Sequence, residues 1–118
     1  MAEIAMGSVM KYRIEFEYSP YPLDKLWVDV RLNEQWTIDE SGDRFGNGAV
    51  YSSRDGRDYK FSLYEGSETI AGLDWEESEY AAGELHILKQ RLAVGGDHLF
   101  KDAGESYHYK IKKITPFI

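Results

Sequence analysis

Strict alternation of apolar and charged side chains near the start of the chain is the sequence feature that most constrains its fold. The apolar or aromatic positions are Met10, Tyr12, Ile14, Phe16 and Tyr18, and every residue between them is Lys, Arg or Glu. A period of two places the two sets on opposite faces of a β-strand, and a charged face is typical of an antiparallel sheet with one side in water. The pattern therefore predicts a half-buried strand over residues 10–18.

Similar patterns predict further strands. Residues 26–32 alternate in the same way and carry Trp27 on their polar face, exposed or covered by a partner. Residues 49–53 and 59–65 read as two strands joined by a tight turn, since Asp55-Gly56 tolerates the positive φ angles of a hairpin. The intervening segment 39–48 contains three glycines in ten residues and predicts a loop.

The C-terminal part predicts a short strand over residues 97–101, a turn over 102–105, and a final strand that ends at Pro116. The final strand carries Tyr107, Tyr109 and Ile111 on one face, and lysines follow on the other side. The lysines are Lys110, Lys112 and Lys113, and they would suit an exposed sheet edge that must not pair with other chains.

Between these groups of strands the period changes to that of a helix. Ala81, Leu85, Leu88 and Leu92 follow one another at offsets of four, three and four. Asp74 with Glu77 would form a capping box, and Gly95-Gly96 a stop. We therefore expect an α+β fold, in which a mainly antiparallel twisted sheet of five to seven strands carries one helix packed on one face.

Composition sets the domain organisation. The chain has 118 residues, of which 42% are hydrophobic, and this is enough to bury one core. Residues 1–9 lack periodicity, and Gly7-Ser8 resembles a cloning junction. We expect residues 1–9 to be a cloning-derived or disordered extension, and residues 10–118 to form a single α+β domain.

Charge and residue usage exclude several classes of function. The formal net charge of −7 disfavours direct nucleic-acid binding, which needs an excess of Lys and Arg. No apolar run approaches the roughly 18 residues of a membrane helix, and no signal peptide is visible, so we expect a cytoplasmic protein without a membrane segment. The absence of cysteine excludes disulfides and thiol catalysis.

No local pattern identifies a catalytic site, a metal site or a cofactor. The three histidines, His86, His98 and His108, are spaced by twelve and ten residues, which matches no common metal-ligand pattern. No Gly-x-Ser-x-Gly motif or phosphate-binding loop occurs. We therefore expect no metal, no cofactor and a non-enzymatic role, although an acid/base enzyme built from distant residues remains the third hypothesis.

One segment departs from the background in its charge. Between Lys60 and Lys89 there is no basic residue, while seven acids and two aromatic residues stand out. The candidate partner-binding residues are Glu65, Glu68, Asp74, Trp75, Glu76, Glu77, Glu79 and Tyr80. Carboxylates that surround aromatic side chains suit an interface with a basic protein, whereas the plainer interpretation is a solvated acidic face at a helix start.

Two hypotheses lead. The first is an acidic protein that binds a basic macromolecular partner, as an inhibitor or immunity-type protein or as a mimic of a nucleic acid. The alternative is a small-molecule-binding domain with a pocket lined by Tyr and Trp side chains between sheet and helix. A homodimer formed through Trp27 or the last strand is a further possibility.

Overall fold

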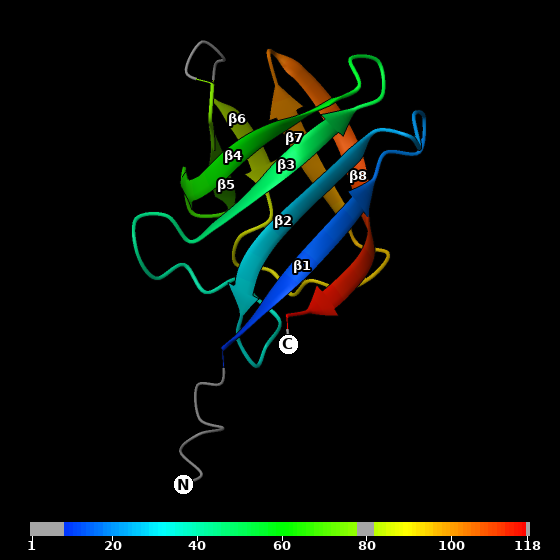
Figure 1. The fold of residues 1–118 in the computed structure, drawn as a ribbon. Helices are drawn as coiled ribbons and strands as arrows, with labels where there is room; N and C mark the ends of the chain where they lie inside the picture. Colours follow the sequence, from blue (N-terminus) through cyan, green and yellow to red (C-terminus); the bar gives the residue numbers. More distant parts are fainter. Residues whose placement is uncertain (1–8, 78–81, 118) are drawn as a thin grey trace, which may run out of the picture.

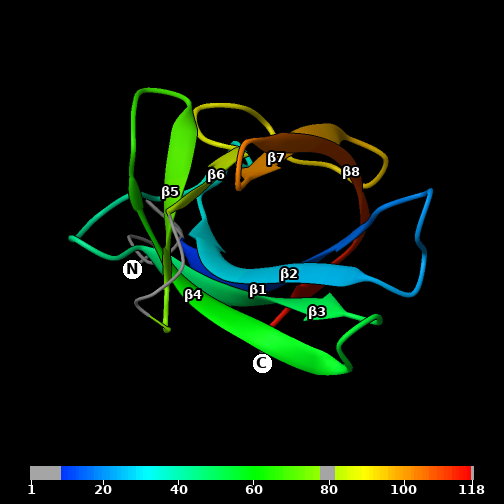
Figure 2. The ribbon, with the colours of Figure 1, turned by 90° about the horizontal axis from the view of Figure 1, so that it is seen from above.

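The computed structural model describes residues 9–77 and 82–117, and within them the chain is a closed β-barrel (Figure 1). Each strand pairs antiparallel with its neighbours in sequence, and the first pairs with the last. Viewed along its length, the sheet forms a ring (Figure 2). The strands are β1 (Met10–Glu17), β2 (Lys25–Leu32), β3 (Gly46–Ser52), β4 (Arg57–Glu65), β5 (Ile70–Trp75), β6 (Gly83–His86), β7 (Asp97–Asp102) and β8 (Glu105–Pro116).

The strands expected from alternation are confirmed. Ile14 and Phe16 of β1 are buried, and so are the four apolar residues of β2. The hairpin between β3 and β4 turns at Gly56, whose φ is +68°. The final strand is confirmed as β8, with Tyr109 and Ile111 inside the barrel.

The expected α+β class is wrong, because the described residues contain eight strands and no helix. The segment that predicted a helix divides instead into β6 and the connection over residues 87–96. Leu85 points inward from β6, and Leu88 and Leu92 are buried residues of the connection itself. Their helix-like spacing therefore reflects burial in two different kinds of structure. Ala81, the first member of the predicted stripe, lies outside the described residues.

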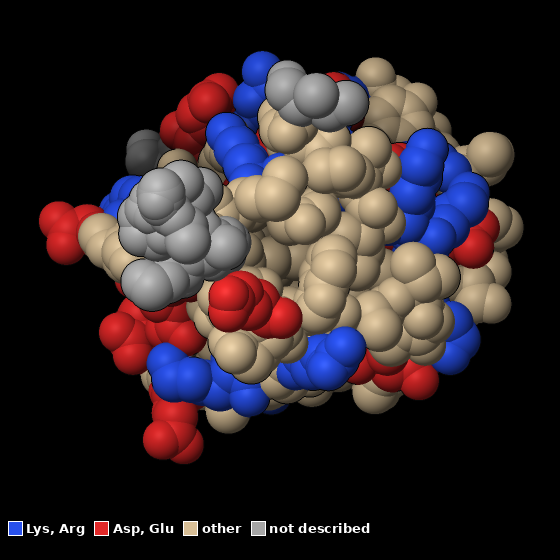
Figure 3. Space-filling view, turned by 90° about the horizontal axis from the view of Figure 1, so that it is seen from below, with Lys and Arg blue, Asp and Glu red and all other residues tan. Residues whose placement is uncertain are grey.

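The end of the barrel that carries the long connections, which we call the lower end, is sealed. The connection over residues 87–96 crosses it, and the amide of Leu92 donates a hydrogen bond to the carbonyl of Trp36 at 2.9 Å. Ile38 and Phe45, from the connection between β2 and β3, are buried there too. Figure 3 shows uncharged side chains over the middle of this end and charged ones mostly around it. The strands' apolar faces are thus closed off from water on this side.

The last strand is not a sheet edge, so the expectation for its lysines is wrong. β8 pairs with β7 on one side and with β1 on the other. The register places Glu15 opposite Lys113 and Glu17 opposite Lys110, and opposite charges across a strand pair are favourable. A shift between Glu15 and Phe16 leaves Lys112 without a register partner on β1. The lysines therefore complement the acidic outer face of β1.

Trp27 is covered by the chain itself. The guanidinium of Arg13 lies 3.9 Å from the centre of the Trp27 ring and makes two hydrogen bonds with the carboxylate of Asp29, at 2.8 and 2.9 Å. Asp29 is buried, and this pairing satisfies both of its oxygens. A cation over an aromatic face and a bidentate ion pair together tie the outer surfaces of β1 and β2.

Within the described residues, no helix has the length and apolar character needed to span a membrane.

β3 begins at Gly46, inside the segment that predicted a loop, because its glycines fill positions where no side chain fits. A Cβ on Gly48 would stand 2.1 Å from the carbonyl oxygen of Trp27 on the neighbouring strand. We expect Gly48→Ala to force β2 and β3 apart and to lower the free energy of unfolding by about 1–3 kcal/mol. Urea denaturation would measure this. The exposed neighbour Asn47→Ala should change stability by less than about 0.5 kcal/mol, and equal effects would contradict the packing argument.

The buried side chain of His98 makes the stability of the folded protein depend on pH. Its ring is buried beside Phe16 and its Nδ1 lies 3.1 Å from the carbonyl of His86. Burial lowers the pKa of His98 below its ordinary value of 6.5, while that hydrogen bond and Asp97 oppose the shift. The unfolded chain therefore binds this proton more readily than the folded chain does. The stability linked to His98 is present above about pH 6.5 and is lost as the pH falls toward the lowered value.

We expect the free energy of unfolding to fall from pH 7.5 to 5.5 by a smaller amount in His98→Asn than in the unchanged protein. The Asn amide can donate to the same carbonyl and does not titrate. Urea denaturation at the two pH values tests this, with the exposed His108→Asn as the matched control. An identical pH response in all three proteins would show that His98 does not titrate on unfolding.

Candidate functional site

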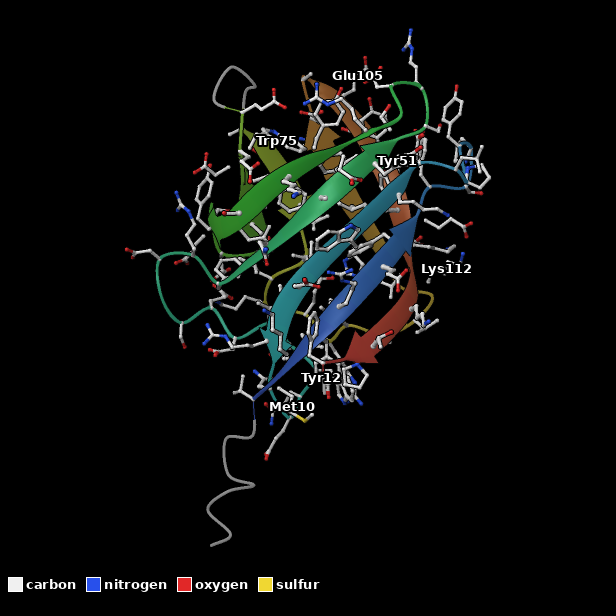
Figure 4. All side chains as sticks on the ribbon, in the orientation of Figure 1. Met10, Tyr12, Tyr51, Trp75, Glu105 and Lys112 are labelled. Atoms are coloured by element: carbon white, nitrogen blue, oxygen red, sulfur yellow. The ribbon has the colours of Figure 1, made fainter. Side chains whose placement is uncertain are left out.

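The upper end of the barrel, opposite the sealed one, holds a cavity of about 780 Å³. Its floor is buried, whereas its rim is formed by exposed residues of the hairpin turns. Trp75 and Glu105 mark this end of the molecule, and Met10 and Tyr12 the other (Figure 4). The residues that line the cavity are Tyr18, Tyr21, Asp24, Val50, Ser52, Ser53, Arg54, Asp55, Tyr59, Trp75, Phe100, Asp102, Ala103, Tyr107 and Tyr109.

Four tyrosines and a phenylalanine form a continuous aromatic wall. Tyr18 stacks on Tyr21 at 5.9 Å and on Tyr109 at 5.2 Å between ring centres. It also meets Tyr107 edge to face at 5.5 Å. Phe100 meets Tyr109 edge to face at 5.8 Å. Such ring pairs hold one another in place, so this wall is preformed in the absence of a ligand.

Closure of the barrel creates this wall. Phe100 of β7 lies opposite Tyr107 of β8, and alternation along β8 turns Tyr107 and Tyr109 inward. Tyr18 directly follows β1, which reaches β8 only because the sheet closes. The end of β1 and the β7–β8 hairpin, which are far apart in the sequence, thus place their aromatic side chains on the same side of the cavity.

The phenols of Tyr107 and Tyr109 are protonated at neutral pH. Burial raises the pKa of the Tyr109 phenol far above its ordinary range and raises that of Tyr107 as well. The hydroxyl of Tyr107 donates a hydrogen bond to Glu105 at 3.2 Å. These residues therefore present neutral ring faces and hydroxyl groups, and not phenolate charges.

Two of the three aspartates at the cavity are hydrogen-bonded within the chain. Asp24 accepts a hydrogen bond from the backbone amide of Ser53 at 2.9 Å, which joins the β1–β2 connection to the β3–β4 turn. Asp55 accepts one from the hydroxyl of Tyr59 at 2.6 Å. The side-chain carboxylate of Asp102 has no hydrogen bond or ion pair within residues 9–77 and 82–117, and burial raises its pKa above the ordinary value.

Trp75 lines the floor of the cavity on the side opposite the aromatic wall. Its ring meets Phe61 edge to face at 5.4 Å, and the side chain is only 8% exposed. The indole Nε1 is buried and finds no acceptor among the residues described. An unpaired buried donor is unfavourable, so an acceptor brought to it would stabilise a complex.

The structure does not gather the acidic segment into one surface. Glu65 and Glu68 are exposed near the β4–β5 turn at the lower end, whereas Glu76 follows β5 toward the upper end and Asp74 lies between them, opposite Ser62 of β4. Alternation along β5 turns Trp75 into the barrel and leaves Asp74 outside. Glu79 and Tyr80 lie outside the described residues, so their part in the predicted partner-binding surface has no structural account.

Arginines of the same chain meet two of these acids. Arg44 donates a hydrogen bond to Asp74 at 2.8 Å, and Arg57 donates one to Glu77. The sequence segment has no basic residue, but the fold supplies basic side chains from other segments. The negative potential that the linear sequence predicts is therefore reduced at these two positions.

No metal site is formed by the residues described, since they contain no group of three or more His, Asp or Glu side chains that could hold an ion. None of the three histidines lines the cavity. The sequence interpretation named Trp75 but missed Tyr18, Phe100 and Asp102 as cavity residues. The alternation of β1 and β8 was the signal for the inward tyrosines, but only closure of the sheet brings the strands together.

Comparison with known proteins gives no relative. No protein-family model matches the sequence, no curated protein matches it, and no solved structure matches the fold. The function must therefore be argued from the cavity.

The ionised carboxylate of Asp102 is expected to lower the stability of the folded protein at neutral pH. Because its folded pKa is raised, the folded chain holds this proton more readily than the unfolded chain, and ionisation above the raised pKa destabilises the fold. We expect Asp102→Asn to raise the melting temperature at pH 7 and to lose most of that advantage at about pH 3, where Asp102 is largely protonated in both states. Thermal unfolding followed by circular dichroism measures the difference, and a variant less stable at pH 7 would contradict it.

Proposed function

We propose that this protein binds a small organic molecule in the upper cavity of the barrel. The observation that carries the proposal is a preformed cavity of about 780 Å³, in which seven of the fifteen described lining residues are aromatic. Ligand sites in proteins are concave, occupy roughly 300–1,000 Å³, and combine apolar walls with a few polar groups. An eight-stranded barrel is wide enough to hold one such ligand between its walls.

The two ends of the barrel support this function in different ways. The sealed lower end stabilises the fold without help from the cavity, since most of the buried aliphatic side chains lie along the strands and in the lower connections. The upper end leaves Tyr18 and Tyr107 only half-buried. Covering partly exposed rings with an apolar ligand would remove further apolar surface from water, which drives binding.

The alternative of a pocket between sheet and helix is replaced by a cavity inside the closed sheet. The hypothesis of a basic macromolecular partner stays a prediction. It is supported less well by the geometry, because Trp75 points into the barrel and Asp74 and Glu77 already meet arginines of the same chain.

A cavity-filling substitution tests the proposal. Val50 is half-buried on the inner face of β3 and lines the cavity, whereas its neighbour Tyr51 lies on the outer face. We expect the neutral fluorescent probe N-phenyl-1-naphthylamine to bind the unchanged protein with an increase in emission. Val50→Trp should weaken this binding by about tenfold or more, because the larger ring occupies the same space.

Tyr51→Trp is the matched control, since it adds the same side chain to the same strand on the other face. It should leave probe binding unchanged. Circular dichroism confirms that both variants are folded. Equal probe affinity in all three folded proteins, or no binding to the unchanged protein, would reject the cavity as a ligand site.

A further inference from the structure

The charged groups at the cavity are unbalanced in sign. Among the described residues, three carboxylates line it, from Asp24, Asp55 and Asp102, against one guanidinium, that of Arg54. Asp24 and Asp55 are held by hydrogen bonds from neutral donors, which leave their negative charge in place. A ligand that enters the cavity therefore meets a net negative lining.

Asp102 is the carboxylate without a partner. It is partly buried on the inner face of β7, two residues beyond Phe100, and the described chain offers it no hydrogen bond or ion pair. The register also sets it opposite Glu105, a second acid, across the β7–β8 turn. A partly desolvated carboxylate beside another acid is unfavourable, and an incoming positive charge would relieve it.

The aromatic wall also attracts positive charge. The faces of Tyr and Phe rings carry the negative part of their quadrupole and attract cations that lie over them. Tyr107 and Asp102 both line the cavity from the paired strands β7 and β8, where Tyr107 lies opposite Phe100, two residues before Asp102. A single region of the cavity thus offers an unpaired carboxylate and electron-rich ring faces.

We propose that the ligand is an organic cation, in which an amine or ammonium group lies beside Asp102 and against the Tyr107 side of the wall, with an apolar body in the rest of the cavity. This inference rests on the proposed function and narrows its ligand class. Neither a carboxylate cluster alone nor an aromatic wall alone would carry it. Their juxtaposition in one cavity does, because both recognise positive charge in a partly water-excluded space.

Three probes with one indole body test the charge preference: tryptamine, which is a cation at pH 7, neutral 3-propylindole, and anionic indole-3-propionate. Affinities are measured by displacement of N-phenyl-1-naphthylamine. We expect tryptamine to bind about tenfold more tightly than the neutral compound, and the anion to bind most weakly.

Asp102→Asn should weaken tryptamine binding by about fivefold or more and leave the affinity for 3-propylindole unchanged, which also shows that the variant is folded. Asp43→Asn is the matched control. It removes the same charge from the exposed connection between β2 and β3 at the lower end, and it should alter no affinity.

The outcomes separate the inference from the function on which it rests. If the protein binds N-phenyl-1-naphthylamine but shows no preference for tryptamine, the organic-cation inference is overturned and the ligand cavity stands. The same holds if Asp102→Asn and Asp43→Asn weaken tryptamine equally, because the effect is then one of overall charge. If neither the neutral probe nor any indole compound binds, the proposed function fails together with the inference.

Discussion

The pairing of β1 with β8 is the interaction on which the rest of this structure depends. It removes both edges from the sheet, so that every strand has a hydrogen-bonded neighbour on each side. It also encloses an interior that eight strands make just wide enough for side chains or for one small molecule. The outer face of this contact is matched in charge, with acids on β1 and lysines on β8. Without it, Tyr18 would not meet the tyrosines of β8, and the chain would have neither a closed core nor a cavity.

Local physics explains which parts of the fold the sequence predicts. Alternation along residues 10–17 and 25–32 survives in the structure because those strands have one dry and one wet face. The Asp55-Gly56 turn is equally local, since it depends on one positive φ angle. The predicted helix is wrong because Leu85 belongs to a short strand, whereas Leu88 and Leu92 belong to an irregular connection. All three are buried, but buried positions in an irregular connection follow no period. The glycines also led to a wrong prediction, that of a loop reaching Gly48. At Gly48 the glycine is required because two strands approach closely.

The candidate site was harder to predict, for a reason that is also physical. Its described lining comes from three strand connections and five strands, and their proximity is a property of the closed sheet and not of any segment. The sequence indicated an aromatic-lined pocket and inward-facing tyrosines on the last strand, but placed the pocket against a helix. It could not show that Asp102 lacks a partner, nor that Arg44 and Arg57 reach across to the acidic segment. The number of acids along the sequence therefore predicted a more negative surface than the fold has, and it did not indicate that the cavity is lined by acids.

The difference between the two ends of the barrel has a consequence for how such a chain can change over evolutionary time. The buried connections at the lower end hold the sheet closed, whereas the described part of the upper rim is formed by the β3–β4 and β7–β8 turns and the mostly exposed β1–β2 connection. Substitutions or insertions in those turns would reshape what the cavity accepts while leaving the closed end untouched. The protein thus keeps its adaptability and its robustness in separate places, so that new specificities can be sampled on one scaffold without first acquiring compensating mutations.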